Sequence, residues 1–128
     1  MSGSIDISEL TTPPEKQEFE TAKFFAAMGK NIRFIRPSSI PNQHMPDFSM
    51  DGIEWEVKCP EGSSKRTIEN NIRKAVTQSR YIIIDLRWIK LPEKLCLSQI
   101  EMHFNTKQVI KRILVITKGL QLVEYSRK

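Results

Sequence analysis

The chain has 128 residues, 39% of them hydrophobic, and a net charge of +5 at pH 7. This length suits one domain around a single core, and no apolar run is as long as the roughly 18 residues that a transmembrane helix needs. Residues 1–12 lack the basic and then apolar segments of a signal peptide, so we expect a polar N-terminal arm followed by one domain over residues 13–128.

The first elements of the domain are expected to be a helix, a short strand and a loop. Two prolines and an acidic first turn mark the start of a helix over residues 15–28, and Gly29 suits its C-terminal cap. Residues 32–35 are typical of a short strand. Three prolines within residues 36–46 indicate a loop.

A hairpin over residues 47–58 is the clearest local pattern. Asp51-Gly52 is typical of a two-residue hairpin turn, and it fixes a register in which Asp47 faces Glu56. Because side chains alternate across a strand, the hairpin has one apolar and one polar face. The apolar face holds Phe48, Met50, Ile53, Trp55 and Val57, and the polar face holds Asp47, Ser49, Glu54, Glu56 and Lys58.

The second half of the chain alternates between helical and strand patterns. The expected elements are a helix over residues 64–80, a buried strand over 81–86, a helix over 106–112, and strands over 113–117 and 120–125, with 91–104 ambiguous. Such an order predicts a mixed α/β domain.

The charges are unevenly distributed. Residues 1–57 carry nine acidic and five basic side chains, whereas residues 58–128 carry six acidic and fifteen basic ones. A basic surface attracts polyanions such as nucleic acids. The two cysteines, Cys59 and Cys96, match no metal-binding or redox spacing, which favours ordinary reduced thiols.

The polar face of the hairpin has the chemistry of a metal site. Directly opposed residues have Cβ atoms roughly 5 Å apart, where like charges are destabilising, so the Asp47–Glu56 pair would be stabilised by a divalent cation. Lys58, on the same face as Glu56, can hold a phosphate oxygen or orient an attacking water. A solvated polar face without a metal explains the same pattern, and both interpretations stay open at this point.

These residues also match a known motif. Pro46-Asp47 and Glu56-Val57-Lys58 have the form of the PD-(D/E)XK nuclease motif. Its surroundings occur in one order: Pro46-Asp47-Phe48, Asp51-Gly52, Trp55-Glu56-Val57-Lys58, Pro60-Glu61-Gly62, Thr67-Ile68, Ile72-Arg73-Lys74-Ala75, Gln78-Ser79 and Ile83-Ile84-Asp85-Leu86. From Glu15 to Ile116 the chain closely resembles the C-terminal tRNase domain of contact-dependent growth-inhibition toxins of the CdiA type.

The resemblance implies a fold, an activity and a set of site residues. The fold is a restriction-endonuclease-like α/β core, in which helices flank a mixed central sheet, so residues 13–128 would be a single nuclease domain. The activity is metal-dependent cleavage of tRNA. The catalytic residues would be Glu18, Asp47, Glu56 and Lys58, with the metal on Asp47 and Glu56. Glu15 and Glu20 compete with Glu18 for the role of the helix glutamate. Carboxylate ligands favour Mg²⁺ or Mn²⁺, and related toxins add Zn²⁺ as an alternative.

The helix after the motif flanks the site in the resembled fold, so its polar residues become candidates for substrate binding. These candidates are Lys65, Arg66, Thr67, Arg73, Lys74 and Gln78. The four cations would receive tRNA phosphates, and Thr67 and Gln78 would contact the phosphate or the metal-bound water. A solvated basic helix face is the alternative.

The resemblance further implies a cognate immunity protein and action in the cytoplasm after delivery as part of a larger secreted toxin. Because the chain is short and starts at Met1, it is expected to be either an excised domain or a free-standing relative. Three other functions remain open. One is a DNA endonuclease of the same fold, and another is a catalytically inactive module that only binds nucleic acid or a partner. The third is a phage or mobile-element structural protein, which only the basic charge supports.

Overall fold

The computed structural model describes residues 2–127, and Met1 and Lys128, which end the predicted arm and domain, lie outside the described residues. Between them the chain forms, in order, β1 (Ser4–Asp6), α1 (Lys16–Ala27), β2 (Asn31–Phe34), β3 (Phe48–Met50), β4 (Ile53–Lys58), α2 (Thr67–Ala75), β5 (Tyr81–Asp85), the 3₁₀ helix η1 (Leu86–Trp88), α3 (Glu93–Thr106), β6 (Arg112–Ile116) and β7 (Leu122–Ser126).

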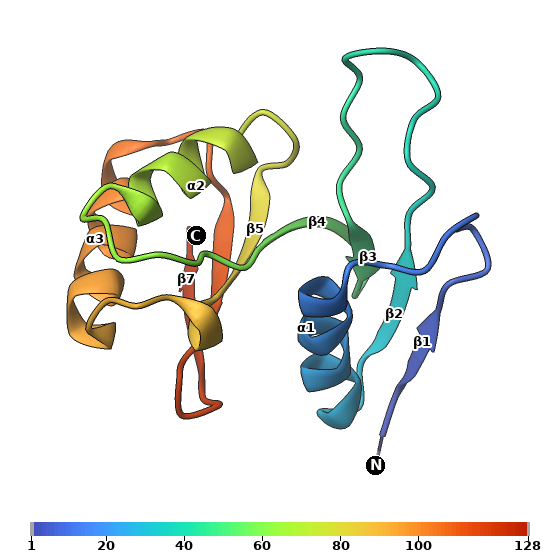
Figure 1. Ribbon diagram of the computed structural model, residues 1–128, viewed down its shortest axis with the longest axis horizontal. Coiled ribbons are helices and arrows are strands. Elements are labelled where there is room, and N and C mark those ends of the chain that lie inside the picture. The colour runs from blue at the N-terminus through green and yellow to red at the C-terminus, as the bar shows by residue number, and fades with distance from the viewer. Residues whose placement is uncertain (1, 128) are drawn as a thin grey trace.

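The strands over residues 2–127 form one seven-stranded sheet in the order β1-β2-β3-β4-β5-β6-β7 (Figure 1). β1 pairs in parallel with β2, and β5 pairs in parallel with both β4 and β6, while the other neighbours are antiparallel. The predicted α/β class with a mixed central sheet is therefore confirmed.

Helices cover both faces of this sheet. α1 packs on one face, where Phe25 joins a core cluster, and α2 and α3 pack on the other, where Ile72 joins a second cluster. β5 supplies both clusters, because Ile83 points to the α1 face and its neighbours Ile82 and Ile84 point to the α2–α3 face. Its apolar run is thus buried on two sides, as predicted for a strand inside a sheet.

The predicted hairpin is present with the predicted register. Asp51 and Gly52 have positive φ angles of 56° and 75°, the combination that a tight two-residue hairpin turn requires. Phe48 faces Trp55 across the pair. The apolar face of the hairpin is buried apart from Ile53, which is half-buried.

The structure corrects the expectation of a polar arm for part of residues 1–12. Ser4–Asp6 form β1, which extends the sheet at its edge beside β2. The Asn31 side-chain oxygen accepts hydrogen bonds from the Ser4 backbone nitrogen at 3.1 Å and from Ser4 Oγ at 2.9 Å. Ser4–Asp6 has too few apolar residues to be recognised as a strand from its sequence. Backbone pairing with β2 and the Asn31 contact hold it in the sheet instead.

Two helix predictions also need correction. The helix expected over residues 64–80 is shorter, since α2 ends at Ala75 and turns follow it. The helix expected over residues 106–112 is wrong, and α3 instead occupies most of the ambiguous segment before it. α3 buries Cys96 and Ile100 in the core cluster that also contains residues of β5 and β6. This burial stabilises a helix over residues 93–106 rather than over residues 106–112.

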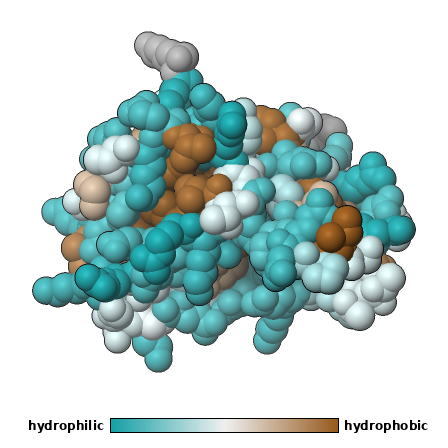
Figure 2. Space-filling view, turned by 90° about the horizontal axis from the view of Figure 1, so that it is seen from above, coloured by the Kyte–Doolittle hydropathy of each residue, from teal (hydrophilic) through white to brown (hydrophobic). Residues whose placement is uncertain are grey.

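No helix within residues 2–127 is both long enough and apolar enough to cross a membrane. The face seen in Figure 2 is mostly hydrophilic, with apolar residues in separate small patches.

Candidate active site

The N-terminal turn of α1 brings Glu18 towards the hairpin. The Glu15 carbonyl accepts the first helical hydrogen bond from the Phe19 N–H at 2.9 Å, and Glu18 follows in the first turn, where a carboxylate is favoured by the helix dipole. Ala22 and Phe25 are buried in the core. Their packing fixes the orientation of α1 and leaves Glu18 half-buried.

Asp47 is hydrogen-bonded to β4 at the residues directly before and after Glu56. Its N–H donates to the Trp55 carbonyl at 2.9 Å, and its Oδ2 accepts from the Val57 N–H at 2.7 Å. The backbone on either side of Glu56 thus fixes the position of the Asp47 carboxylate. The predicted proximity of Asp47 and Glu56 follows from these two contacts.

Glu56 is only 4% exposed, although the sequence places it on the polar face of the hairpin. Lys58 Nζ lies 3.2 Å from Glu56 Oε2. The other carboxylate oxygen, Oε1, is buried and has no hydrogen-bond partner among residues 2–127. A buried acceptor without a partner is costly, so this position is open to a proton donor or a cation.

Burial raises the pKa of three carboxyl groups, Glu18, Asp47 and Glu56, which we call the carboxylate cluster. Burial, followed by the charge of Asp47, raises the pKa of both Glu18 and Glu56 to about 8. Burial also raises the pKa of Asp47. The Lys58 ammonium opposes all three shifts but does not cancel them, because one cation cannot neutralise three buried acids.

The carboxylate cluster has the oxygen donors that a hard divalent cation prefers. Within residues 2–127, however, no three or more His, Cys, Asp and Glu side chains are grouped closely enough to hold a metal ion. The unpaired Oε1 of Glu56 and the raised pKa values nevertheless fit a cation, since both would be relieved by a second positive charge. Asp47 and Glu56 are the residues that would hold it.

The raised pKa values predict how stability changes with pH in the presence of a chelator. Between about pH 4.5 and pH 8 the folded state holds protons on Glu18 and Glu56 that the unfolded state has lost. The free energy of unfolding should therefore fall as pH rises through this range and level off above it. Adding Mg²⁺ or Mn²⁺ should raise the melting temperature at pH 8.5 more than at pH 5.5, because protons compete with the cation.

Two substitutions on β4 check the source of this effect. Glu56→Gln removes one titrating carboxyl and should flatten the fall in melting temperature between pH 5 and pH 8.5. Glu54→Gln is the matched control, because Glu54 is exposed two residues earlier on the same strand. Equal pH profiles for wild type and Glu56→Gln would contradict the assignment.

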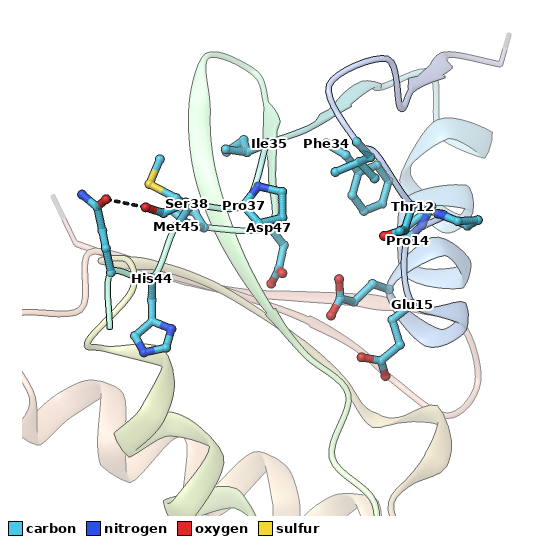
Figure 3. Close-up of a pocket in the computed structure, with 15 residues that line it drawn as sticks. Thr12, Pro14, Glu15, Phe34, Ile35, Pro37, Ser38, His44, Met45 and Asp47 are labelled. Atoms are coloured by element: carbon cyan, nitrogen blue, oxygen red, sulfur yellow. Dashed lines mark hydrogen bonds between the residues drawn. The ribbon is translucent and has the colours of Figure 1, made fainter. Parts of the chain in front are cut away.

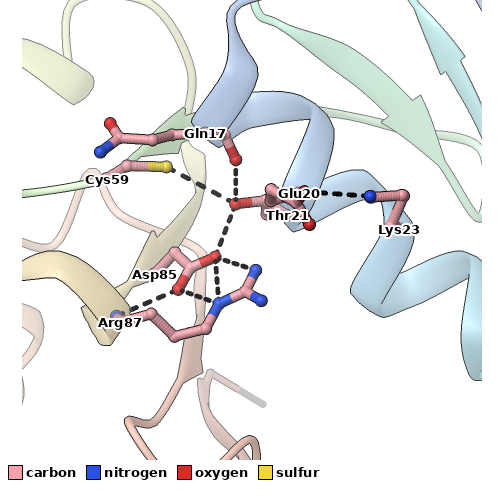
Figure 4. Close-up of polar contacts among 7 residues, drawn as sticks. All are labelled: Gln17, Glu20, Thr21, Lys23, Cys59, Asp85 and Arg87. Atoms are coloured by element: carbon pink, nitrogen blue, oxygen red, sulfur yellow. Dashed lines mark hydrogen bonds and ion pairs between the residues drawn. The ribbon is translucent and has the colours of Figure 1, made fainter.

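The structure places two of the three candidates for the helix glutamate, Glu15 and Glu18, around the same cavity as Asp47 and sets Glu20 apart from it. Glu18 belongs to the carboxylate cluster, and the exposed Glu15 raises its pKa further through charge. Figure 3 shows the Glu15 and Asp47 carboxylates projecting into a shared space between α1 and the β2–β3 loop. Glu20 instead forms an ion pair with Lys23 at 2.9 Å, apart from this space (Figure 4).

The six predicted substrate residues lie in and around α2. Lys65 and Arg66 are exposed in the loop before it, Thr67 is its first residue, and Arg73 and Lys74 are exposed in its last turn. Gln78 follows α2 and lines a shallow cavity with Pro46, the residue before Asp47. Thr67 is half-buried, and no hydrogen bond or ion pair described within residues 2–127 joins any of the six to Glu56 or Asp47.

A buried network beneath α1 is the feature that the sequence interpretation did not resolve. Asp85 is completely buried, and its Oδ2 accepts from Thr21 Oγ1 at 2.7 Å and from Arg87 Nη2 at 2.7 Å (Figure 4). The sequence signal was a lone acidic residue at the end of an apolar strand. Thr21 lies three residues after Glu18, so this network fixes the helix that carries the cluster's first carboxylate.

The two cysteines are free thiols, as expected. Thr21 Oγ1 lies 3.5 Å from Cys59 Sγ, and burial raises the pKa of Cys59 to about 12. Burial also raises the pKa of Cys96. Both groups therefore stay protonated near neutral pH and are poor nucleophiles.

Comparison with known proteins agrees with the fold. A family model described as the contact-dependent growth inhibition CdiA C-terminal domain matches residues 44–122, which include Asp47, Glu56 and Lys58. The structure of a CdiA-CT/CdiI toxin and immunity complex from Burkholderia pseudomallei superimposes with a TM-score of 0.70 at 19% identity, covering 98% of this chain and 100% of that one. None of the curated proteins compared with the chain matches it. The chain thus belongs to the CdiA C-terminal domain family of contact-dependent growth inhibition.

Proposed function

We propose that the protein is a metal-dependent endoribonuclease that cleaves tRNA and uses a restriction-endonuclease-like PD-(D/E)XK core. The observation that carries the proposal is the burial of Glu56 next to Asp47, with Lys58 bound to one of its oxygens and the other oxygen unpaired. A purely structural hairpin has no reason to bury such a carboxylate at this cost. Perturbed acids that share one site are typical of catalytic centres.

The residues divide the proposed chemistry between them. A divalent cation on Asp47 and Glu56, Mg²⁺ or Mn²⁺ by ligand chemistry with Zn²⁺ as the alternative, would activate a water and offset charge on the phosphate. Lys58 orients the Glu56 carboxylate through their 3.2 Å contact and can donate to a phosphate oxygen. Glu18, with its pKa raised to about 8, is largely protonated at neutral pH and can donate a proton there.

The proposal assigns substrate docking to the basic residues around α2. Lys65, Arg66, Arg73 and Lys74 are exposed and would bind phosphates of the RNA backbone. Thr67 and Gln78 would contact the phosphate nearest the cluster. Contacts of this kind position a nucleic acid without reading its sequence.

The family supports a toxin role with a cognate immunity protein. The solved relative is described as part of a toxin and immunity complex, and we extend that partnership to this chain. Action in the cytoplasm of a target cell, as the terminal domain of a larger secreted protein, follows from the same proposal. The immunity protein would bind either the carboxylate cluster or the basic face around α2.

One cleavage experiment separates this function from its alternatives. The chain is incubated with total tRNA and with plasmid DNA, in Mg²⁺, Mn²⁺ or Zn²⁺ and in chelator. We expect tRNA to be cut only when a metal is present. Cleavage of DNA alone would support a DNA endonuclease of the same fold, and binding without any cleavage would support an inactive nucleic-acid-binding module.

A further inference from the structure

A cavity of about 430 Å³ opens beside the carboxylate cluster (Figure 3). Glu18 and Asp47 form part of its lining, so the cavity and the cluster share two side chains. The remaining walls come from the segment before α1 and from the β2–β3 loop. A ligand held at the cluster would therefore extend directly into this space.

Rigid apolar residues form part of the cavity wall, beside its carboxylates. Pro13, Pro14 and Pro37 line it with few rotatable bonds. Phe34 is 2% exposed and packs edge-on against Phe48, with ring centroids 5.5 Å apart. The Ile35 N–H donates to the Asp47 carbonyl at 3.0 Å, which ties the wall to the cluster.

Polar groups stand at the mouth of the cavity. Glu15, Gln43 and His44 line it and are exposed. The Gln43 side-chain oxygen accepts a hydrogen bond from Ser38 Oγ, so its amide N–H groups remain available to a ligand. A pocket that combines rigid apolar rings with polar groups can enclose a small organic group and fix its orientation.

We infer that this cavity receives an unpaired nucleobase of the nucleotide next to the scissile phosphate. The inference rests on the proposed nuclease function. A phosphate at the carboxylate cluster would place one of its two nucleosides beside this cavity, because Glu18 and Asp47 line both. Sequence-specific RNA recognition targets unstacked bases, which apolar side chains enclose and polar groups contact along their edges. The protein should accordingly cut at unpaired nucleotides rather than within a helical stem.

The test fills the cavity and measures RNA binding without cleavage. Thr12 lines the cavity, whereas its neighbour Thr11 does not, and both are exposed. Thr12→Trp therefore places a large side chain at the cavity, and Thr11→Trp is the matched control. Binding of two labelled RNAs is measured in Ca²⁺, a hard cation that carboxylates also hold, with gel electrophoresis verifying that the RNA stays intact: a hairpin with an unpaired loop, and a fully paired duplex of the same length. Circular dichroism verifies that both variants are folded.

Wild type and Thr11→Trp should bind the hairpin at least about tenfold more tightly than the duplex, and Thr12→Trp should lose this preference while it binds the duplex normally. Equal binding of the two RNAs by wild type, or an unchanged preference in Thr12→Trp, would overturn the inference. A cavity that receives a protein segment would leave RNA binding by both variants unchanged, which also overturns it. Because the readout is binding to intact RNA, its failure is separate from a failure to cleave.

Discussion

Asp47→Asn should reduce cleavage of tRNA by more than about 100-fold, because substitutions at outer partners of metal ligands already cost roughly 10- to 100-fold. The variant keeps the shape of the side chain and retains an oxygen that can accept from the Val57 N–H, which the wild-type carboxylate does at 2.7 Å. Only the negative charge at the carboxylate cluster is lost. The initial rate of tRNA cleavage in Mg²⁺ or Mn²⁺, measured alongside the melting temperature, checks this expectation.

Asp51→Asn is the matched control, since Asp51 lies in the turn of the same hairpin and forms an exposed ion pair with Lys30 at 2.8 Å. Asparagine also tolerates the positive φ of that position. This variant should cleave within about twofold of wild type, because exposed ion pairs contribute at most about 1 kcal/mol. Equal activity of Asp47→Asn and wild type would remove Asp47 from the proposed mechanism.

Asp85→Ala should destabilise the fold by about 3 kcal/mol. Asp85 is completely buried and accepts from both Thr21 and Arg87, and removal of one partner from a buried ion pair costs about 3–5 kcal/mol. The lower end of this range of costs applies because the Arg87 side chain is 22% exposed, so water can partly solvate it once Asp85 is removed. The free energy of unfolding, from urea titration, gives the measurement.

Glu124→Ala provides the comparison for this substitution. Glu124 also pairs with an arginine, Arg112, at 2.8 Å, but the Glu124 side chain is 42% exposed on the edge strand β7. Its loss should cost less than about 1 kcal/mol. A destabilisation by Asp85→Ala as small as that of Glu124→Ala would show that the buried network does not anchor α1.

The hairpin shows how far local sequence determines this protein. Asp51-Gly52 allows one turn type, the turn fixes the register, and the register predicts that Asp47 approaches Glu56. The apolar faces of β5 and of the hairpin likewise follow from alternation and composition. Local sequence fails for β1, which joins the sheet through backbone pairing. It also fails at α3, where packing against the sheet selects the helical segment from an ambiguous stretch.

The sequence by itself therefore determined the mixed α/β class, the hairpin and the identity of Asp47, Glu56 and Lys58 as candidates. Only the tertiary structure decided that Glu56 is buried, with one carboxylate oxygen bound to Lys58 and the other without a described partner. It also decided that Glu18, rather than Glu20, lies near Asp47. The same holds for the hydrogen bond from Thr21 to Asp85, which anchors α1. The physical reason is that turn geometry and strand alternation act over a few residues. Burial and the pKa shifts that it causes depend on which elements meet, and Glu18 and Asp47 come together only when α1 packs on the sheet.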